Sequence, residues 1–153
     1  MTIKSSLLLL SLLGIFAACG PKATKETKPL TASDIQLLEE EVMRLHDSVM
    51  PQTSEIMSYK RKFQEQAELS EDSLSTESFK NAALELEQAY HLMMDWMQAY
   101  HAPDPQSSLE AREAYLLDEL NKVQEVVDAY TKALSHAHDL DSLRWKCFLF
   151  LVL

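Results

Sequence analysis

The sequence predicts an all-α protein: an elongated antiparallel three-helix bundle with a kinked first helix, after a cleaved lipoprotein signal peptide. Three observations indicate this fold. Apolar residues recur every three or four positions along three long stretches, as in amphipathic helices. Polar segments separate these stretches, and glycine is absent from Pro21 to Leu153. Tight hairpin turns favour glycine, so helices joined by polar loops fit this composition better than sheets do.

Residues 1–18 are expected to form the signal peptide. An apolar run of 12 residues, Leu7–Ala18, follows Lys4. A membrane-spanning helix needs about 20 apolar residues, whereas a shorter run behind a positive charge is typical of an export signal. The run ends in the small residues Ala17 and Ala18, which suit a cleavage site. We therefore expect this segment to be removed.

The segment Phe16-Ala17-Ala18-Cys19 resembles the lipobox of bacterial lipoproteins, in which cleavage falls directly before a cysteine that carries acyl chains. Phe16 stands where that motif usually has leucine. The resemblance implies that Cys19 is lipidated and that acyl chains attach the protein to a membrane. Two or three acyl chains suffice for stable anchoring without a spanning helix. Residues 19–32 are expected to form a flexible tether.

Charge divides the chain into a basic tether and an acidic body. Residues 20–30 carry a net charge of +2, and residues 31–153 carry −13. Nucleic-acid-binding proteins present basic patches, so no nucleic-acid partner is expected. The lack of glycine after Gly20 also excludes glycine-rich phosphate loops and the nucleophile elbow of hydrolases.

The first helix of the bundle is predicted over residues 34–68. Ser33 is the expected N-cap, with Gln36 completing a capping box. Proline usually ends or kinks a helix. The apolar pattern nevertheless keeps its phase across Pro51, because Val49 and Ile56 are one heptad apart. We therefore expect one kinked helix. Its apolar face consists of Ile35, Leu38, Val42, Leu45, Val49, Ile56, Tyr59 and Phe63.

The second helix is predicted to begin at a cap on Ser75 or Thr76 and to end before the two prolines of "HAPDPQ". The third is predicted to begin at Ser107, with Glu110 in a capping box, and to end near Leu140. The bundle therefore spans residues 33–140. The two apolar faces are Phe79, Ala83, Leu86, Tyr90, Met93, Met97 and Tyr100, and Leu116, Leu120, Val123, Val127, Tyr130, Leu134 and Ala137.

Residues 141–153 form an apolar C-terminal tail that ends in "CFLFLVL". Three interpretations remain open: the tail packs along the bundle, it is an altered or truncated end rather than evolved sequence, or it is a strand that binds a partner. With Cys19 lipidated, Cys147 is left without a partner for an internal disulfide.

Methionine and histidine are the only candidates for chemistry. One stripe on the first helix consists of Met43, His46, Met50 and Met57, and a similar stripe on the second consists of His91, Met94, Met97 and His101. Thioether and imidazole groups together can bind Cu(I). Methionine more commonly fills gaps in helical cores. Core packing is therefore the favoured interpretation, and no metal or cofactor is expected. The basic run Lys60–Lys62 is interpreted as stabilising the end of the first helix through the helix dipole, in preference to a binding patch. The pair His136 and His138 is interpreted as a solvated helix end.

The stretches "LHDSVMP" (45–51) and "MMDWM" (93–97) resemble a family of small Gram-negative bacterial lipoproteins, often labelled "viral A-type inclusion protein". The resemblance covers the signal, the tether and roughly residues 33–138. It implies a lipidated, all-helical envelope protein and transfers no activity or site residues. The final residues from Arg144 depart from the polar helical end usual in that family.

The resulting functional hypothesis is a non-enzymatic envelope lipoprotein whose bundle binds or buttresses another envelope component. Gly20 follows the lipidated cysteine where an aspartate would resemble an inner-membrane retention signal, so the outer membrane is expected. The basic residues that come next favour a body that faces the periplasm. The alternative is a periplasmic copper-binding lipoprotein that uses Met43, His46, Met50, His91, Met94 and Met97.

Overall fold

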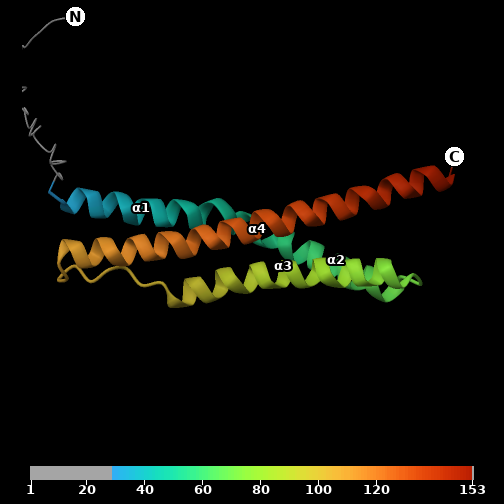
Figure 1. Ribbon diagram of the computed structural model, residues 1–153, viewed down its shortest axis with the longest axis horizontal. Coiled ribbons are helices and arrows are strands. Elements are labelled where there is room, and N and C mark those ends of the chain that lie inside the picture. The colour runs from blue at the N-terminus through green and yellow to red at the C-terminus, as the bar shows by residue number, and fades with distance from the viewer. Residues whose placement is uncertain (1–28, 153) are drawn as a thin grey trace, which may run out of the picture.

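The computed structural model describes the backbone of residues 29–152 and the side chains of residues 29–143. The predicted signal peptide and Cys19 lie outside this range. The described chain is helical, in the order α1 (Ala32–Val49), the 3-10 turn η1 (Met50–Gln52), α2 (Thr53–Leu69), α3 (Ser73–Ala99) and α4 (Leu109–Val152). The long helices lie side by side in an elongated bundle (Figure 1). This confirms the predicted all-α fold class.

The kink at Pro51 is also confirmed. Proline has no N–H to donate, so the regular helical bond from residue 51 cannot form. The backbone tightens instead into η1, where the Thr53 N–H donates to the Met50 carbonyl. Met50 and Thr53 keep right-handed helical dihedrals. The chain therefore continues in the same direction, and α1, η1 and α2 together form the first arm of the bundle (Figure 1).

The first arm changes its main neighbour at this kink. α1 packs chiefly on α4, and α2 packs chiefly on α3. The side chains that α3 presents to the two halves of the first arm differ in size. The small, buried Ala83 lines a groove together with Ala67 of α2. Further along α3, the bulky Trp96 is buried and lies against His46 of α1.

The core is continuous along the bundle and is built from heptad positions. Ile35, Val42 and Val49 of α1 are fully or almost fully buried, as are Leu116, Val123 and Tyr130 of α4. α1 and α4 run in the same direction, with α3 antiparallel to both (Figure 1). On α4 the buried set also includes Val126 and Ala133, which the predicted face omits. The buried face of α4 is broader than predicted because α4 packs against both α1 and α3.

The helix N-caps differ from those predicted. Thr31, not Ser33, caps α1, and it forms a reciprocal capping box with Asp34. Asp72, not Ser75 or Thr76, caps α3, and its carboxylate accepts from the Ser75 N–H at 2.9 Å. Ser108, not Ser107, caps α4 by accepting from the Ala111 N–H at 3.2 Å. In each case the N-cap is the residue whose side-chain oxygen accepts from the free backbone N–H three positions later.

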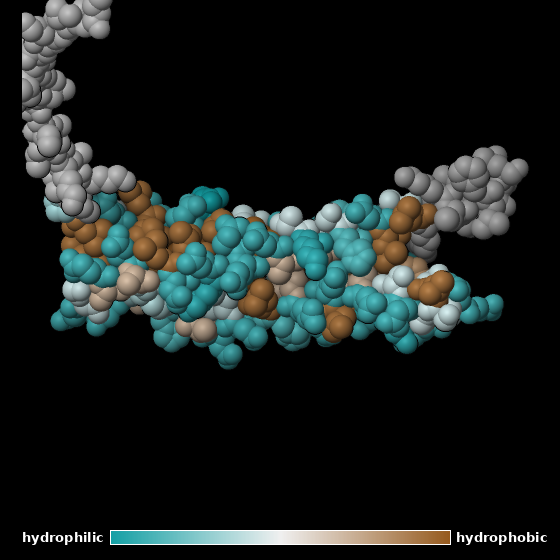
Figure 2. Space-filling model, in the orientation of Figure 1, coloured by the Kyte–Doolittle hydropathy of each residue, from teal (hydrophilic) through white to brown (hydrophobic). Residues whose placement is uncertain are grey.

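α4 extends to Val152, twelve residues beyond the predicted end at Leu140. The tail interpretation as a partner-binding strand is therefore wrong, since its backbone is helical as far as Val152. The described helices contain no segment that is both long and apolar enough to cross a membrane. Most of the visible surface is hydrophilic, and hydrophobic residues gather where α1 and α4 begin (Figure 2).

Candidate functional site

A row of aromatic side chains joins the three arms in the half of the bundle that contains the starts of α1 and α4. The row runs from His46 on α1 through Trp96 and Tyr100 to Tyr115 on α4. Successive ring centroids are 5.7, 5.1 and 6.5 Å apart. Trp96 is buried and belongs to the hydrophobic core, so it anchors the row in the bundle. We call these four residues the aromatic row.

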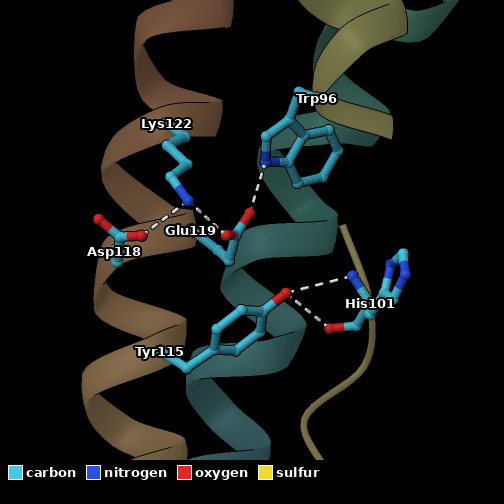
Figure 3. Close-up of polar contacts among 6 residues, drawn as sticks. All are labelled: Trp96, His101, Tyr115, Asp118, Glu119 and Lys122. Atoms are coloured by element: carbon cyan, nitrogen blue, oxygen red, sulfur yellow. Dashed lines mark hydrogen bonds and ion pairs between the residues drawn. The ribbon is translucent and has the colours of Figure 1, made fainter. Parts of the chain in front are cut away.

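A buried carboxylate lies against this row. Glu119 on α4 is 4% exposed and accepts a hydrogen bond of 3.0 Å from the Trp96 indole N–H. Its other oxygen lies 2.8 Å from the Lys122 ammonium, which also lies 2.7 Å from Asp118 (Figure 3). These two partners raise the pKa of Lys122. The Lys122 charge and the indole N–H together compensate for burying the Glu119 carboxylate.

Tyr115 fixes the connection that leaves α3. Its hydroxyl donates to the His101 carbonyl at 2.8 Å and accepts from the His101 N–H at 3.1 Å (Figure 3). The neighbouring Tyr100 hydroxyl is buried and has no hydrogen-bond partner within residues 29–143. The pKa of Tyr100 is raised, mainly because its hydroxyl is buried. An open groove of about 400 Å³ lies beside this connection, and its lining includes His101, Asp104, Arg112 and Tyr115.

His46 links the aromatic row to a thioether. Its Nδ1 lies 2.8 Å from an oxygen of Asp47, and its Nε2 lies 3.3 Å from Met97 Sδ on α3. The His46 side chain is only 16% exposed. The structure therefore brings one histidine and one methionine of the two predicted stripes into contact.

The other stripe residues are placed differently. Met43 is 38% exposed, and His91 is exposed with its ring against Tyr90. Met50 and Met94 are partly buried against the core, in keeping with a packing role. Across the described side chains, no cluster of three or more His, Cys, Asp or Glu residues is arranged to hold a metal ion.

Ion pairs and histidine–carboxylate contacts tie the helices together in the other half of the bundle. Lys60 on α2 lies 2.5 Å from Glu87 on α3, and Lys62 lies 2.6 Å from Asp141 on α4. Lys60 and Lys62 of the basic run therefore connect α2 to its neighbouring helices. The sequence had suggested only a role at the end of a helix. The two histidines of α4 also lie inside a continuing helix. Their contacts are His136 with Glu85 at 2.7 Å and His138 with Glu55 at 2.8 Å.

Glu119 is the site residue that the sequence analysis missed. Its position gave a usable signal, because it lies three residues after Leu116 and four before Val123, on the buried face. An acidic residue at such a position predicts a buried polar contact, here with Trp96.

These features define an acidic helical bundle whose three arms are joined by an aromatic row and a buried carboxylate. No protein-family model matches the chain, and no curated protein or solved structure matches it either.

Proposed function

We propose that this protein is a non-enzymatic envelope lipoprotein, anchored through acyl chains on Cys19, whose helical bundle binds or buttresses another envelope component. The observation that carries the proposal is the segment Phe16–Cys19 after a short apolar run, with a basic tether between it and the bundle. The resemblance of "LHDSVMP" and "MMDWM" to small envelope lipoproteins supports it.

The dimensions of the bundle suit a spacer or docking rod. A helix rises about 1.5 Å per residue, so the 44 residues of α4 extend over roughly 66 Å. The tether of residues 20–30 adds at most about 36 Å when fully extended. α1 begins next to the tether, so the aromatic row would lie in the half of the rod nearer to the anchor.

A non-enzymatic role is supported by how the polar groups of the site are used. Glu119 is engaged by Trp96 and Lys122, and Tyr115 is engaged by the His101 backbone. These contacts stabilise the fold. A general acid, base or nucleophile needs a reactive atom directed toward a substrate.

The orientation we propose is on the outer membrane with the body facing the periplasm. The acidic body would be repelled by anionic lipid, while the lysines of the tether would be attracted to it. The rod would then project away from the membrane surface and present its long sides to a protein partner.

Replacing Cys19 tests the anchor. Wild-type protein should partition with membranes and carry acyl mass at its mature N-terminus, and Cys19→Ala should lack that mass. Cys147→Ser is the matched control and should keep it. A soluble wild-type protein without lipid would refute the anchor. Protease that removes the body from intact cells would refute the periplasmic orientation.

Cross-linking in intact cells tests the structural role. Lysine-reactive cross-linkers followed by mass spectrometry should join bundle lysines to the same envelope protein in repeated experiments. Cells with the acylated tether but without the bundle should lose that cross-linked protein. The same yield without the bundle would show that the bundle is not the binding element.

A further inference from the structure

We propose that the groove at the start of α4 binds the C-terminal carboxylate of a peptide with small apolar side chains, and that Arg112 holds this carboxylate. The groove lies between the first turns of α4 and the connection of residues 100–108, and we call it the Arg112 groove. Its volume of about 400 Å³ lies within the range of ligand sites.

This inference deepens the binding role proposed above by naming the chemistry of a partner, and it rests on that role. Its tests use purified protein and short peptides. A negative result would therefore refute the Arg112 groove and leave the lipid anchor and the cross-linked partner untouched.

Arg112 is a half-buried cation without a counter-ion. Its Nε is buried and has no hydrogen-bond partner, and no carboxylate of the described side chains forms an ion pair with its guanidinium. The two half-buried lysines, Lys60 and Lys62, each lie within 2.6 Å of a carboxylate on a neighbouring helix. The body is strongly acidic, so carboxylates are not scarce. Because an unpartnered buried N–H costs free energy, Arg112 is open to an acceptor from outside the chain.

The wall opposite α4 is fixed by hydrogen bonds. The Tyr115 hydroxyl bonds to the backbone N–H and carbonyl of His101 at 3.1 and 2.8 Å (Figure 3). Asp104 then closes a turn, because its carbonyl accepts from the Ser107 N–H at 3.0 Å and its carboxylate accepts from the Gln106 N–H at 2.9 Å. The groove is therefore preformed, and a ligand loses little affinity to ordering it.

The charges of the groove suit a ligand with one negative charge. A guanidinium offers paired N–H groups that a single carboxylate accepts in a bidentate arrangement. The Asp104 carboxylate lines the same groove, and Glu110 and Glu113 lie next to Arg112 in the sequence. These acids repel a phosphate group, which carries a charge of about −1.5 to −2, more strongly than they repel a carboxylate. One arginine in these surroundings favours a carboxylate.

The apolar part of the lining consists of small residues. They are Ala99, Ala102, Pro103 and Ala111. Such a surface accepts side chains of about the size of a methyl group close to the carboxylate. The groove is open to solvent, so a peptide can place its end at Arg112 and continue outward. A peptide that ends in alanine therefore matches both the charge and the shape.

Calorimetric titration with N-acetylated Ala-Ala-Ala tests the site on the full chain in detergent. The free-acid peptide should bind at one site per chain, and the same peptide with a C-terminal amide should bind at least tenfold more weakly. In isotope-labelled protein, the NMR signal of the Arg112 Nε–H should shift with the free acid and stay in place with the amide. Inorganic phosphate should bind more weakly than the free-acid peptide.

Variants locate the carboxylate. Arg112→Gln should weaken binding of the free-acid peptide at least tenfold, whereas Arg61→Gln, the same change at an exposed position of α2, should stay within twofold of the wild type. Ala111→Leu fills the groove with a good helix former, so it should also weaken binding at least tenfold and remains informative if Arg112→Gln misfolds. Ala114→Leu, an exposed position of the same helix, is its matched control and should stay within twofold.

Four outcomes would overturn the proposal. The first is a folded wild type that does not bind the free-acid peptide, and the second is an amide that binds within twofold of the acid. The third is a folded Arg112→Gln or Ala111→Leu variant that binds within twofold of the wild type. The fourth is phosphate that binds more tightly than the peptide, which would show a simple anion site.

Discussion

Glu119 shows how one buried charge can be accommodated in an otherwise apolar core. Its carboxylate is almost completely removed from solvent, yet it has a hydrogen-bond donor on one side and a cation on the other. A buried polar group that loses its partner costs free energy, whereas a fully partnered one is tolerated. The indole N–H of Trp96 depends on Glu119 in the same way.

We expect Glu119→Leu to lower the free energy of unfolding by about 2 kcal/mol, because it leaves the buried Trp96 N–H without an acceptor. Glu119→Gln keeps an acceptor and should cost less. Asp118→Leu is the matched control, since the exposed Asp118 also pairs with Lys122, and it should change stability by less than about 0.5 kcal/mol. Urea unfolding monitored by circular dichroism measures all three. Equal effects of Glu119→Leu and Asp118→Leu would contradict this account.

Glu85 provides a pH-dependent contribution at the contact of α3 with α4. The hydrogen bond with His136, together with the charges of His136 and Lys132, holds the pKa of Glu85 below its ordinary value of 4.5. The folded state therefore binds this proton less readily than the unfolded state. The resulting stabilisation is present above about pH 4.5 and is lost as the pH falls through the lowered pKa.

The urea midpoint should consequently fall between about pH 5 and pH 3, and Glu85→Gln should flatten this decline. Glu77→Gln, an exposed change on the same helix, serves as the control and should keep the wild-type slope. A Glu85→Gln curve parallel to the wild type would show that this ion pair does not affect acid stability.

At the scale of elements, α1, α3 and α4 each begin directly after a side chain that accepts a hydrogen bond from a free backbone N–H. The start of α4 offers a sharp comparison, because two serines are adjacent. Only Ser108 accepts from the Ala111 N–H, while the Ser107 N–H bonds to the Asp104 carbonyl in the preceding turn. A single residue of offset therefore decides which hydroxyl caps the helix.

Ser108→Ala should destabilise the protein by about 1 kcal/mol through loss of the N-cap. Ser107→Ala should destabilise the protein by no more than about 0.3 kcal/mol, because the Ser107 side chain does not cap the helix. Thermal unfolding of the two variants side by side measures the difference. If Ser107→Ala proved the more harmful change, the helix would begin one residue earlier than the structure shows.

At the scale of the whole molecule, the bundle holds together through a core that the described side chains trace along α4 as far as Ala137. Ala137 is the last fully buried side chain of the described core, and Leu140 is partly buried against it. The interhelical pair between Lys62 and Asp141 lies close to the same point. Cooperative unfolding should therefore depend on the chain up to about residue 143.

A chain that ends at Leu143 should still unfold in one cooperative transition, with a change in stability below about 1 kcal/mol. Its helical signal should fall only in proportion to the residues removed. Circular dichroism with calorimetry can check both expectations. A broad, non-cooperative transition would show that residues 144–152 contribute to the core.

The sequence by itself determined the all-α class, the three long arms and the continuation through Pro51. Hydrophobic periodicity carries this information, because a helix must bury one face whatever its neighbours are. The register of the apolar positions across Pro51, from Val49 to Ile56, required the helix to resume in the same direction.

Tertiary structure alone decided which residues meet. Helical spacing groups His46 with Met43 and Met50, but packing places it against Met97 and Trp96. It also decided that Glu119 is buried and that α1 and α2 have different main neighbours. The physical reason is that periodicity fixes a face and not its partner. The partner depends on side chains contributed by distant parts of the chain, such as the small Ala83 of α3 beside α2 and the bulky Trp96 of α3 beside α1.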